Sequence, residues 1–180
     1  MARINDNLFT GALAPALIRE AGGGWRTRFG WMRARFVPQG LAELEFCQEN
    51  SGASARVDHV FAKAFHAWLD VFQRLPAGER WGCLAPQGSD FQRRVWRELM
   101  AIPAGTRVSY RELAERIGKP GAARAVGGAV GANPLCLLVP CHRVVQSSGR
   151  LGGYRWGAER KRALLDAEAT AGTDLRSLFQ

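Results

Sequence analysis

The chain has 180 residues, and its 25 Lys and Arg against 16 Asp and Glu give a formal net charge of +9. A chain of this length can bury roughly 70% of its unfolded surface, so it needs no disulfide or metal to fold. No stretch approaches the roughly 18 consecutive apolar residues of a membrane span, and the N-terminus lacks a signal-peptide pattern. We therefore expect an intracellular protein, cytoplasmic or, in a eukaryote, nuclear.

The excess of positive charge lies in the second half of the chain. Residues 1–85 hold 10 basic and 8 acidic side chains, whereas residues 86–180 hold 15 basic and 8 acidic ones. Such an excess favours a polyanionic partner. Because Arg supplies 22 of the 25 cations, a compositional bias toward Arg codons is the alternative explanation.

The cysteines indicate neither a disulfide framework nor a zinc site. The chain has four, too few and too scattered for a secreted scaffold and without a Cys-x-x-Cys pair: Cys47, Cys83, Cys136 and Cys141. His59 and His66 lie seven residues apart in an expected helix and could share one face with Cys47 or Cys83. Buried cysteines and amphipathic histidines are common, so we expect these residues to have packing roles and no metal to bind.

The first half is typical of an α/β domain. Residues 31–37 and 41–46 predict a β-hairpin joined by Pro38-Gln39-Gly40. Residues 57–75 then change to helical spacing, with one apolar stripe: Val57, Phe61, Ala64, Trp68, Phe72 and Leu75. Pro and Gly in residues 76–89 disfavour both helix and strand, so we expect a linker from about residue 76. The chain would then consist of one domain over residues 1–85 and a second over residues 86–180.

The second domain begins with two predicted helices, each with a capping box. Ser89 with Gln92 starts the first, whose buried side we expect to be Phe91, Val95, Trp96 and Leu99. Ser109 with Glu112 starts the second, which Gly118 ends after the apolar positions Leu113, Ala114 and Ile117.

A third helix over residues 122–130 follows a tight break at residues 119–121, and the pair predicts a helix-turn-helix. Gly127 and Gly128 each cost this helix roughly 1 kcal/mol in propensity. Such glycines are tolerated where something approaches the backbone closely, either a nucleic-acid backbone or a neighbouring helix of the core.

Residues 135–139 are continuously apolar and predict a strand buried on both faces, which leads into Pro140-Cys141-His142-Arg143. A thiol with His142 and Arg143 beside it is a candidate nucleophile, although an inert buried cysteine fits the same pattern. In an extended chain neighbouring side chains point apart, so contact between Cys141 and His142 needs a local bend or a bridging water.

The last helix offers a third group for such a site. Glu168 shares a face with Leu164, Leu165 and Ala169, away from the basic residues 160–162. A carboxylate among apolar neighbours needs a partner, and His142 would give a Glu168–His142–Cys141 relay. A salt bridge from Glu168 to an arginine is the alternative.

Five motifs in this half occur in an order that resembles the O6-alkylguanine-DNA alkyltransferases. They are residues 108–110 (Val-Ser-Tyr), 124–128 (Arg-Ala-Val-Gly-Gly), 133–134 (Asn-Pro), 140–144 (Pro-Cys-His-Arg-Val) and 153–157 (Gly-Tyr-Arg-Trp-Gly). The resemblance runs from about Phe91 to Glu168. It implies an amino-terminal α/β domain of the ribonuclease H-like type, followed by a winged helix-turn-helix domain.

The resemblance also implies a role for each matching residue. Cys141 corresponds to the alkyl-accepting cysteine, His142 to the histidine that deprotonates it through a water, and Glu168 to the carboxylate that orients the histidine. Asn133 corresponds to the asparagine that holds the turn before the active site. The remaining matches are Tyr110 as proton donor, Arg124 as the finger that replaces the flipped base, Val144, Tyr154 and Arg155 around the base pocket, and Ala123, Ala125, Gly127 and Ser147 at the DNA. Some relatives carry Ser at the position of Arg155.

The implied reaction is a single, irreversible transfer of the alkyl group from O6-alkylguanine in double-stranded DNA to Cys141 after nucleotide flipping, with O4-alkylthymine as an open second substrate. It needs no cofactor, in keeping with the lack of a Gly-x-Gly-x-x-Gly motif or phosphate loop. We expect a monomer whose cooperativity on DNA is open. Two alternatives are a non-catalytic damage sensor, which would have another residue in place of Cys141, and a thiol hydrolase that uses Cys141, His142 and Glu168.

Overall fold

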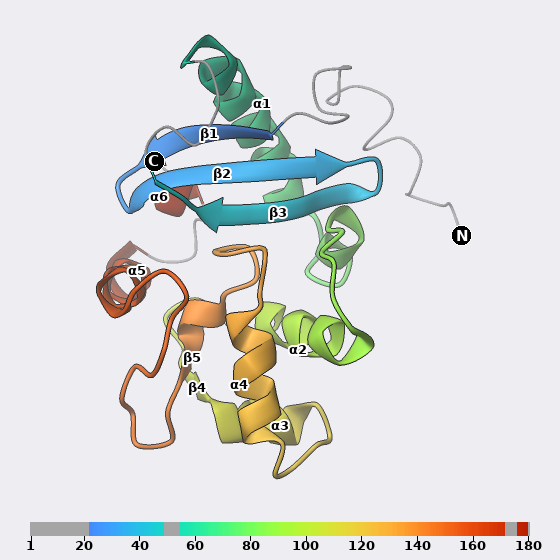
Figure 1. Ribbon diagram of the computed structural model, residues 1–180, viewed down its shortest axis with the longest axis vertical. Helices are drawn as coiled ribbons and strands as arrows, with labels where there is room; N and C mark the ends of the chain where they lie inside the picture. The colour runs from blue at the N-terminus through green and yellow to red at the C-terminus, as the bar shows by residue number, and fades with distance from the viewer. Residues whose placement is uncertain (1–21, 49–54, 172–175, 180) are drawn as a thin grey trace. The chain divides into compact units, whose positions relative to one another are not determined.

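The computed structural model describes residues 22–48, 55–171 and 176–179, which combine helices with short sheets (Figure 1). The chain forms two compact units, Met1–Gln87 together with Gln180, and Gly88–Phe179. Within the described ranges, no helix is both long and apolar enough to cross a bilayer.

The first unit is built on an antiparallel sheet in the order β1 (Gly22–Thr27), β2 (Gly30–Val37) and β3 (Gly40–Phe46). The predicted hairpin is confirmed as β2 and β3, which pair from Met32 opposite Phe46 to Val37 opposite Gly40 with a shift of register between Arg35 and Phe36. Gly40 has φ of 141°, and a Cβ there would lie 2.5 Å from the Cys83 carbonyl oxygen, so the turn requires glycine. The edge strand β1 was not predicted, because three successive glycines hide its pattern.

The predicted helix is also confirmed, as α1 (Ala55–Arg74), which packs on the sheet (Figure 1). Its buried stripe is Phe61, Phe65, Trp68, Leu69 and Phe72, whereas Ala64 and Leu75 are half-buried and the side chain of Val57 lies outside the described residues. The Trp25 ring of β1 packs in a tilted arrangement with its centroid 4.5 Å from that of Phe65, and the Trp68 ring stacks on Phe72 at 5.0 Å. This aromatic core accounts for the stripe that the sequence shows.

The Pro- and Gly-rich segment after α1 is more ordered than expected. It contains a short 3₁₀ helix, η2 (Arg80–Cys83), and Leu84 then forms a parallel bridge to Leu41. All four cysteines are free thiols. Among the described residues, no group of three or more His, Cys, Asp or Glu side chains is placed to hold a metal ion.

The second unit has three helices, α2 (Asp90–Met100), α3 (Tyr110–Arg116) and α4 (Ala123–Gly131), and α4 packs against both of the others. Both predicted capping boxes are present. The Ser89 and Ser109 hydroxyl oxygens each accept from the backbone amide three residues on, and the serine backbone amides donate in return to the side-chain oxygens of Gln92 and Glu112. Val95, Trp96 and Leu99 are buried as predicted, and Phe91 is half-buried. The Trp96 indole donates to the Ala129 carbonyl at 2.8 Å, which joins α2 to α4.

Two further elements complete the unit. β4 (Val108–Ser109) pairs in parallel with β5 (Val144–Val145), and α5 (Ala158–Ala171) precedes the short α6 (Arg176–Phe179). Because β4 leads directly into α3 and β5 follows Cys141, this small ladder places the start of α3 beside the candidate nucleophile.

The predicted strand over residues 135–139 is wrong. All five side chains are buried, but the backbone forms a turn in which the Val139 amide donates to the Leu135 carbonyl and Leu137 has φ of 68°. Asn133 holds this turn, accepting from the Leu135 amide at 2.9 Å and donating to the Val139 carbonyl at 2.8 Å. A continuous apolar run indicates that a segment is buried, but it does not determine the backbone conformation. Here hydrogen bonds with the Asn133 side chain satisfy backbone groups that a neighbouring strand would otherwise satisfy.

We expect Ser109→Ala to lower the free energy of unfolding by about 1 kcal/mol, because the Glu112 amide loses its capping acceptor. Urea unfolding followed by circular dichroism measures this, with the exposed Ser148→Ala as the control. An equal effect of the two substitutions would contradict a capping role.

Candidate active site

Cys141 begins a short 3₁₀ turn, η3 (Cys141–Arg143), that follows the Asn133-held turn. Its thiol is buried, with 3% of the residue exposed, and accepts a hydrogen bond from Asn133 Nδ2 at 3.2 Å. Asn133 therefore fixes both the backbone before the cysteine and the sulfur itself. Burial raises the pKa of Cys141 to about 11, although the Asn133 hydrogen bond and the Lys161 charge pull it down.

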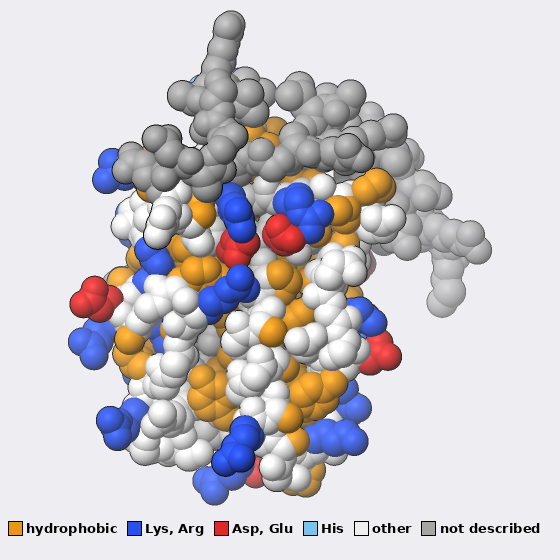
Figure 2. Space-filling model, viewed as in Figure 1, with side chains coloured by type: hydrophobic (Ala, Val, Ile, Leu, Met, Phe, Trp, Pro, Cys, Tyr) orange, Lys and Arg blue, Asp and Glu red, His pale blue; other side chains and the backbone are white. Residues whose placement is uncertain are grey.

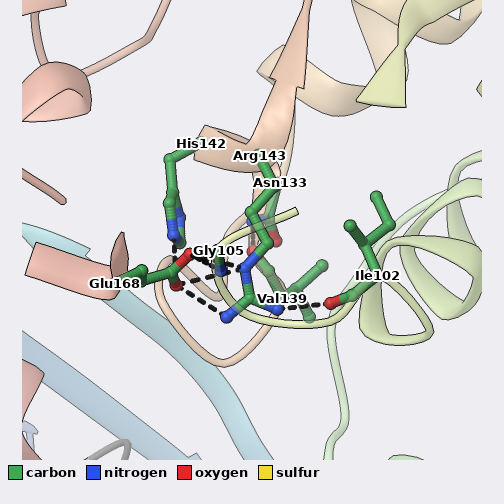
Figure 3. Close-up of polar contacts among 7 residues, drawn as sticks. All are labelled: Ile102, Gly105, Asn133, Val139, His142, Arg143 and Glu168. Carbon is green, nitrogen blue, oxygen red and sulfur yellow. Dashed lines mark hydrogen bonds and ion pairs between the residues drawn. The ribbon is translucent and has the colours of Figure 1, made fainter. Parts of the chain in front are cut away.

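Glu168 lies between the two residues that follow Cys141 (Figure 3). Its Oε1 is 2.8 Å from His142 Nε2 and 2.6 Å from Arg143 Nη2. The Gly105 amide also donates to Oε2 at 3.3 Å. The Arg143 guanidinium donates a further hydrogen bond to the Ile102 carbonyl. Both partners that the sequence left open for Glu168, histidine and arginine, are thus present at once.

The charge state of this cluster follows from its contacts. Despite burial, the hydrogen bonds from His142 and Arg143 lower the pKa of Glu168 to about 2, so the carboxylate is ionised at neutral pH. Burial lowers the pKa of His142, which keeps the imidazole neutral. A neutral ring that donates from Nε2 to Glu168 carries a free lone pair on Nδ1.

The link from His142 to Cys141 is not direct. His142 Nδ1 is buried and has no hydrogen-bond partner among the described residues. A buried nitrogen with an unused lone pair is placed to accept a proton through a bridging water, which is one of the two links that the sequence left open for this pair.

A cavity of about 400 Å³ opens beside the thiol. Of the residues predicted for the site, Cys141, Tyr110, Gly127, Tyr154 and Arg155 line it. The lining that the sequence did not predict is Val130, Gly131, Gly153 and Trp156. Val144 is buried next to the thiol turn, and its carbonyl is held by Lys161.

Tyr110 forms one wall of this cavity. Its ring lies between Gly127 and Gly152, where added Cβ atoms would come within 3.7 Å and 3.4 Å of it. Gly152 has φ of 68°, so glycine is required there for the backbone as well. Burial, and then the nearby Cys141, raise the pKa of Tyr110, so its hydroxyl is a protonated donor at neutral pH.

Tyr154 stands close to the same thiol. Burial above all, and then Cys141, raise the pKa of Tyr154 well above its usual value. Its hydroxyl is buried without a hydrogen-bond partner among the described residues, and its ring contacts Trp156 edge-on at 5.2 Å. Polar groups that are buried and unpaired at a cavity indicate a site built for a polar ligand.

Four predicted DNA-contact residues lie outside the cavity. Arg124, Ala125 and Ser147 are exposed, and Ala123 is half-buried. A Cβ on Gly128 would meet nothing within 4 Å, so no neighbouring helix of the described structure explains that glycine. Of the two explanations for the slim helix, close approach from outside is the one that remains for Gly128.

Lys161 is the residue that the sequence analysis misplaced. It was expected on an exposed basic side of the last helix, but it is fully buried on the same face as Leu164, Leu165 and Glu168, and Ala169 is exposed. The spacing 161, 164, 165 and 168 carried that signal.

The Lys161 ammonium donates to three carbonyls, those of Val144 at 2.6 Å, Leu151, and Gly153 at 3.3 Å. It thereby ties α5 to the strand after Cys141 and to the loop that lines the cavity. Burial lowers the pKa of Lys161 to about 8, so the cation still predominates at neutral pH.

A family model described as the DNA-binding domain of 6-O-methylguanine DNA methyltransferase matches residues 90–170. The chain is 54% identical over 93 residues to the methylated-DNA--protein-cysteine methyltransferase of Mycobacterium tuberculosis, which covers 52% of this chain and 56% of that protein. It is 54% identical over 81 residues to the Saccharomyces cerevisiae protein of the same name, covering 45% and 43%. The aligned sequence thus spans about half the length of these relatives.

The fold comparison extends further along the chain. A crystal structure of Mycobacterium tuberculosis OGT in complex with DNA superposes with a TM-score of 0.65 at 34% identity. The match covers 88% of this chain and 99% of that one, so the likeness includes the first unit.

Acid should weaken the fold through Glu168. An ordinary glutamate has a pKa of about 4.3, and that of Glu168 is lowered to about 2. The ionised Glu168 therefore contributes up to about 3 kcal/mol to the free energy of unfolding. This contribution is complete above about pH 5 and is lost as the pH falls to about 2. Urea unfolding of wild type and Glu168→Gln from pH 7 to 2 should show their difference shrinking with acid. A difference independent of pH would contradict the ionised cluster; the exposed Asp166→Asn is the control.

Labelling of Cys141 by iodoacetamide should be slow at neutral pH and rise about tenfold per pH unit toward pH 11, because the thiolate is the nucleophile and the pKa of Cys141 is about 11. Peptide mapping at each pH measures this rate, with half-buried Cys47 as the internal reference. A plateau below pH 9 would contradict a protonated resting thiol.

Proposed function

Because the chain belongs to the O6-methylguanine-DNA methyltransferase family, we propose that it repairs DNA by moving an alkyl group from guanine O6 to Cys141. One observation carries the proposal. Cys141 lines a cavity of about 400 Å³ together with Tyr110, Tyr154 and Arg155, while the His142–Glu168 pair lies behind it. Pockets for single small molecules begin at about this size, and a flipped nucleobase falls within it.

The transfer needs a thiolate, which the buried thiol lacks at rest. His142 Nδ1 accepts the Cys141 proton through a water, and Glu168 stabilises the imidazolium that forms. The sulfur then attacks the alkyl carbon, the carbon–O6 bond breaks, and its electron pair leaves with guanine. Tyr110, at the cavity wall, donates its hydroxyl proton to the departing guanine anion, and the proton held on the His142 imidazolium then restores the tyrosine, so the Cys141 proton ends on guanine.

The product explains why one molecule acts once. The new bond is a thioether, which offers no good leaving group to water or to a second thiol. Cys141 is therefore consumed, and the reaction is stoichiometric. O4-alkylthymine presents a similar alkyl–oxygen bond and is a second candidate substrate.

The second unit supplies the DNA contacts in this proposal. We assign residues 86–180 as a winged helix-turn-helix domain, with α3 and α4 as the helices and the segment after β5 as the wing. The slim α4, with Gly128 open to its surroundings, enters the minor groove, and exposed Arg124 fills the space of the flipped nucleotide. Ala123, Ala125, Gly127 and Ser147 flank that contact.

We assign residues 1–85 as the amino-terminal domain of the ribonuclease H-like type, with its linker from about residue 76. The described sheet of three antiparallel strands with α1 packed on it supports this assignment. The partner is double-stranded DNA that carries the lesion, bound mainly through phosphates and therefore without strong sequence preference.

One experiment separates this function from its alternatives. The protein is incubated with a duplex that contains O6-methylguanine, and its intact mass and the modified peptide are then measured. We expect one methyl group on Cys141 per molecule, even with duplex in excess, and none in Cys141→Ser. Arg124→Ala should slow transfer from the duplex much more than transfer from the free O6-alkylguanine base, because only the duplex requires flipping.

The other outcomes identify the other functions. An unchanged mass with tight binding of the lesion would indicate a damage sensor. Repeated turnover of an ester or amide at Cys141 without methylation would indicate a thiol hydrolase. Either result would overturn alkyl transfer.

A further inference from the structure

A second hollow, of about 530 Å³, lies in the second unit apart from the Cys141 cavity. Its lining includes three arginines from different segments: Arg107 before β4, Arg150 in the loop after β5, and Arg162 on α5. Leu151 and Leu165 contribute an apolar part, and the two cavities share no lining residue. Three distant parts of the chain thus bring cations to one concave site.

The charge of this hollow is not balanced by the protein. Asp166 is the single carboxylate of its lining, against three guanidinium groups. Over the described ranges, none of the three arginines forms an ion pair or a side-chain hydrogen bond, and all three are exposed. Three positive charges that converge with a single carboxylate among them favour the binding of an anion from outside.

The surface of the second unit also carries more basic than acidic side chains on the face in view. On the face that Figure 2 shows, Lys and Arg side chains are spread over the region that α2 to α5 occupy in Figure 1, with few acidic side chains among them. Some arginines of the chain do have carboxylate partners: on β2, Arg33 pairs with Glu45 and Arg35 with Glu43. Arg93 and Arg143 of the second unit also have carboxylate partners, and no such partner is present for the three arginines of the hollow in the described structure.

Arginine selects among anions by its shape. The planar guanidinium presents parallel N–H groups that match two oxygens of a phosphate, whereas a lysine acts as a point charge. The basic side chains of the lining are all arginine. An open hollow lined by three such groups suits a phosphate that remains attached to a larger molecule.

The hollow is connected to the reactive cavity by the chain itself. Gly149, Arg150 and Leu151 line the hollow, and residues 153–156 of the same loop line the cavity. Arg107 precedes Tyr110 by three residues, across β4. The Lys161 ammonium holds the Leu151 and Gly153 carbonyls together, so the two linings are coupled at the loop.

We propose that Arg107, Arg150 and Arg162 form a phosphate-binding site that holds the backbone of the damaged duplex beside the cavity, an inference that rests on the proposed function. A duplex carries a phosphate charge about every 1.7 Å of its axis, so a nucleotide inserted at Cys141 brings further phosphates past the shared loop. The site steadies the duplex while one nucleotide is extruded. It leaves the chemistry at the sulfur unchanged.

The test compares arginines inside and outside the hollow. Arg107→Gln, Arg150→Gln and Arg162→Gln are made singly and together, and the matched triple variant changes Arg26, Arg74 and Arg94, which are exposed and lie outside both cavities. The two triple variants lose the same charge. Binding to an unmodified duplex is titrated against salt, and transfer rates are measured from a methylated duplex and from the free O6-alkylguanine base.

The logarithm of the binding constant falls linearly with the logarithm of the salt concentration. We expect each single hollow substitution to reduce the steepness of this fall by about 1, and the hollow triple variant to reduce it by about 3. Its affinity at about 0.1 M salt and its rate with the duplex should fall at least about tenfold. Its rate with the free base should match that of wild type, which also shows that it is folded. The matched triple variant should change the slope by less than about 1.

Equal slopes for the two triple variants would overturn the phosphate site while the function stands. Loss of transfer from the free base in the hollow triple variant would also overturn it, because the arginines would then serve the fold or the chemistry. If wild type binds DNA with the expected salt dependence but never alkylates Cys141, the proposed function fails, and the slopes still decide the phosphate site.

Discussion

A buried carboxylate is the constraint on which the second unit depends. Glu168 is 5% exposed, and an ion so far from water is stable only when its oxygens are fully used. Here they accept from His142, Arg143 and the Gly105 amide, so one side chain of α5 fixes η3 and the segment after α2. The catalytic turn therefore has a defined position only when α5 is docked, which joins the fold and the site in one interaction.

The thiol is governed by an opposing pair of requirements. The proposed function requires it to react with one alkyl carbon, yet a free thiolate reacts with oxidants and electrophiles of many kinds. Burial keeps Cys141 protonated, while Asn133 and Lys161 favour the anion. In the proposed single transfer, a protonated resting state preserves the thiol until a base and a substrate are both in place, and the neutral His142 with its open Nδ1 is that base.

The parts that the sequence predicted are those that local chemistry decides. Both capping boxes, the β2–β3 hairpin and the α1 helix depend on residues a few positions apart and are confirmed, and Phe61, Trp68 and Phe72 of the predicted α1 stripe are buried. The turn at residues 135–139 was missed because continuous hydrophobicity measures burial and says nothing of the backbone, which Asn133 bonds into a turn. Lys161 was missed because a lysine among arginines suggests solvent, and only tertiary structure supplies the three carbonyls that hold it.

The position of the unpaired arginines bears on the excess charge of the second half. An arginine surplus caused by codon bias alone would be spread without regard to the reactive site. Both units hold exposed arginines that make no ion pair in the described structure, but those of the second unit include Arg107, Arg124, Arg150 and Arg162, which belong to the unit that carries Cys141. Exposed cations that the fold leaves unpaired around a reactive thiol are available to an external polyanion, and this arrangement accounts for where the excess charge lies.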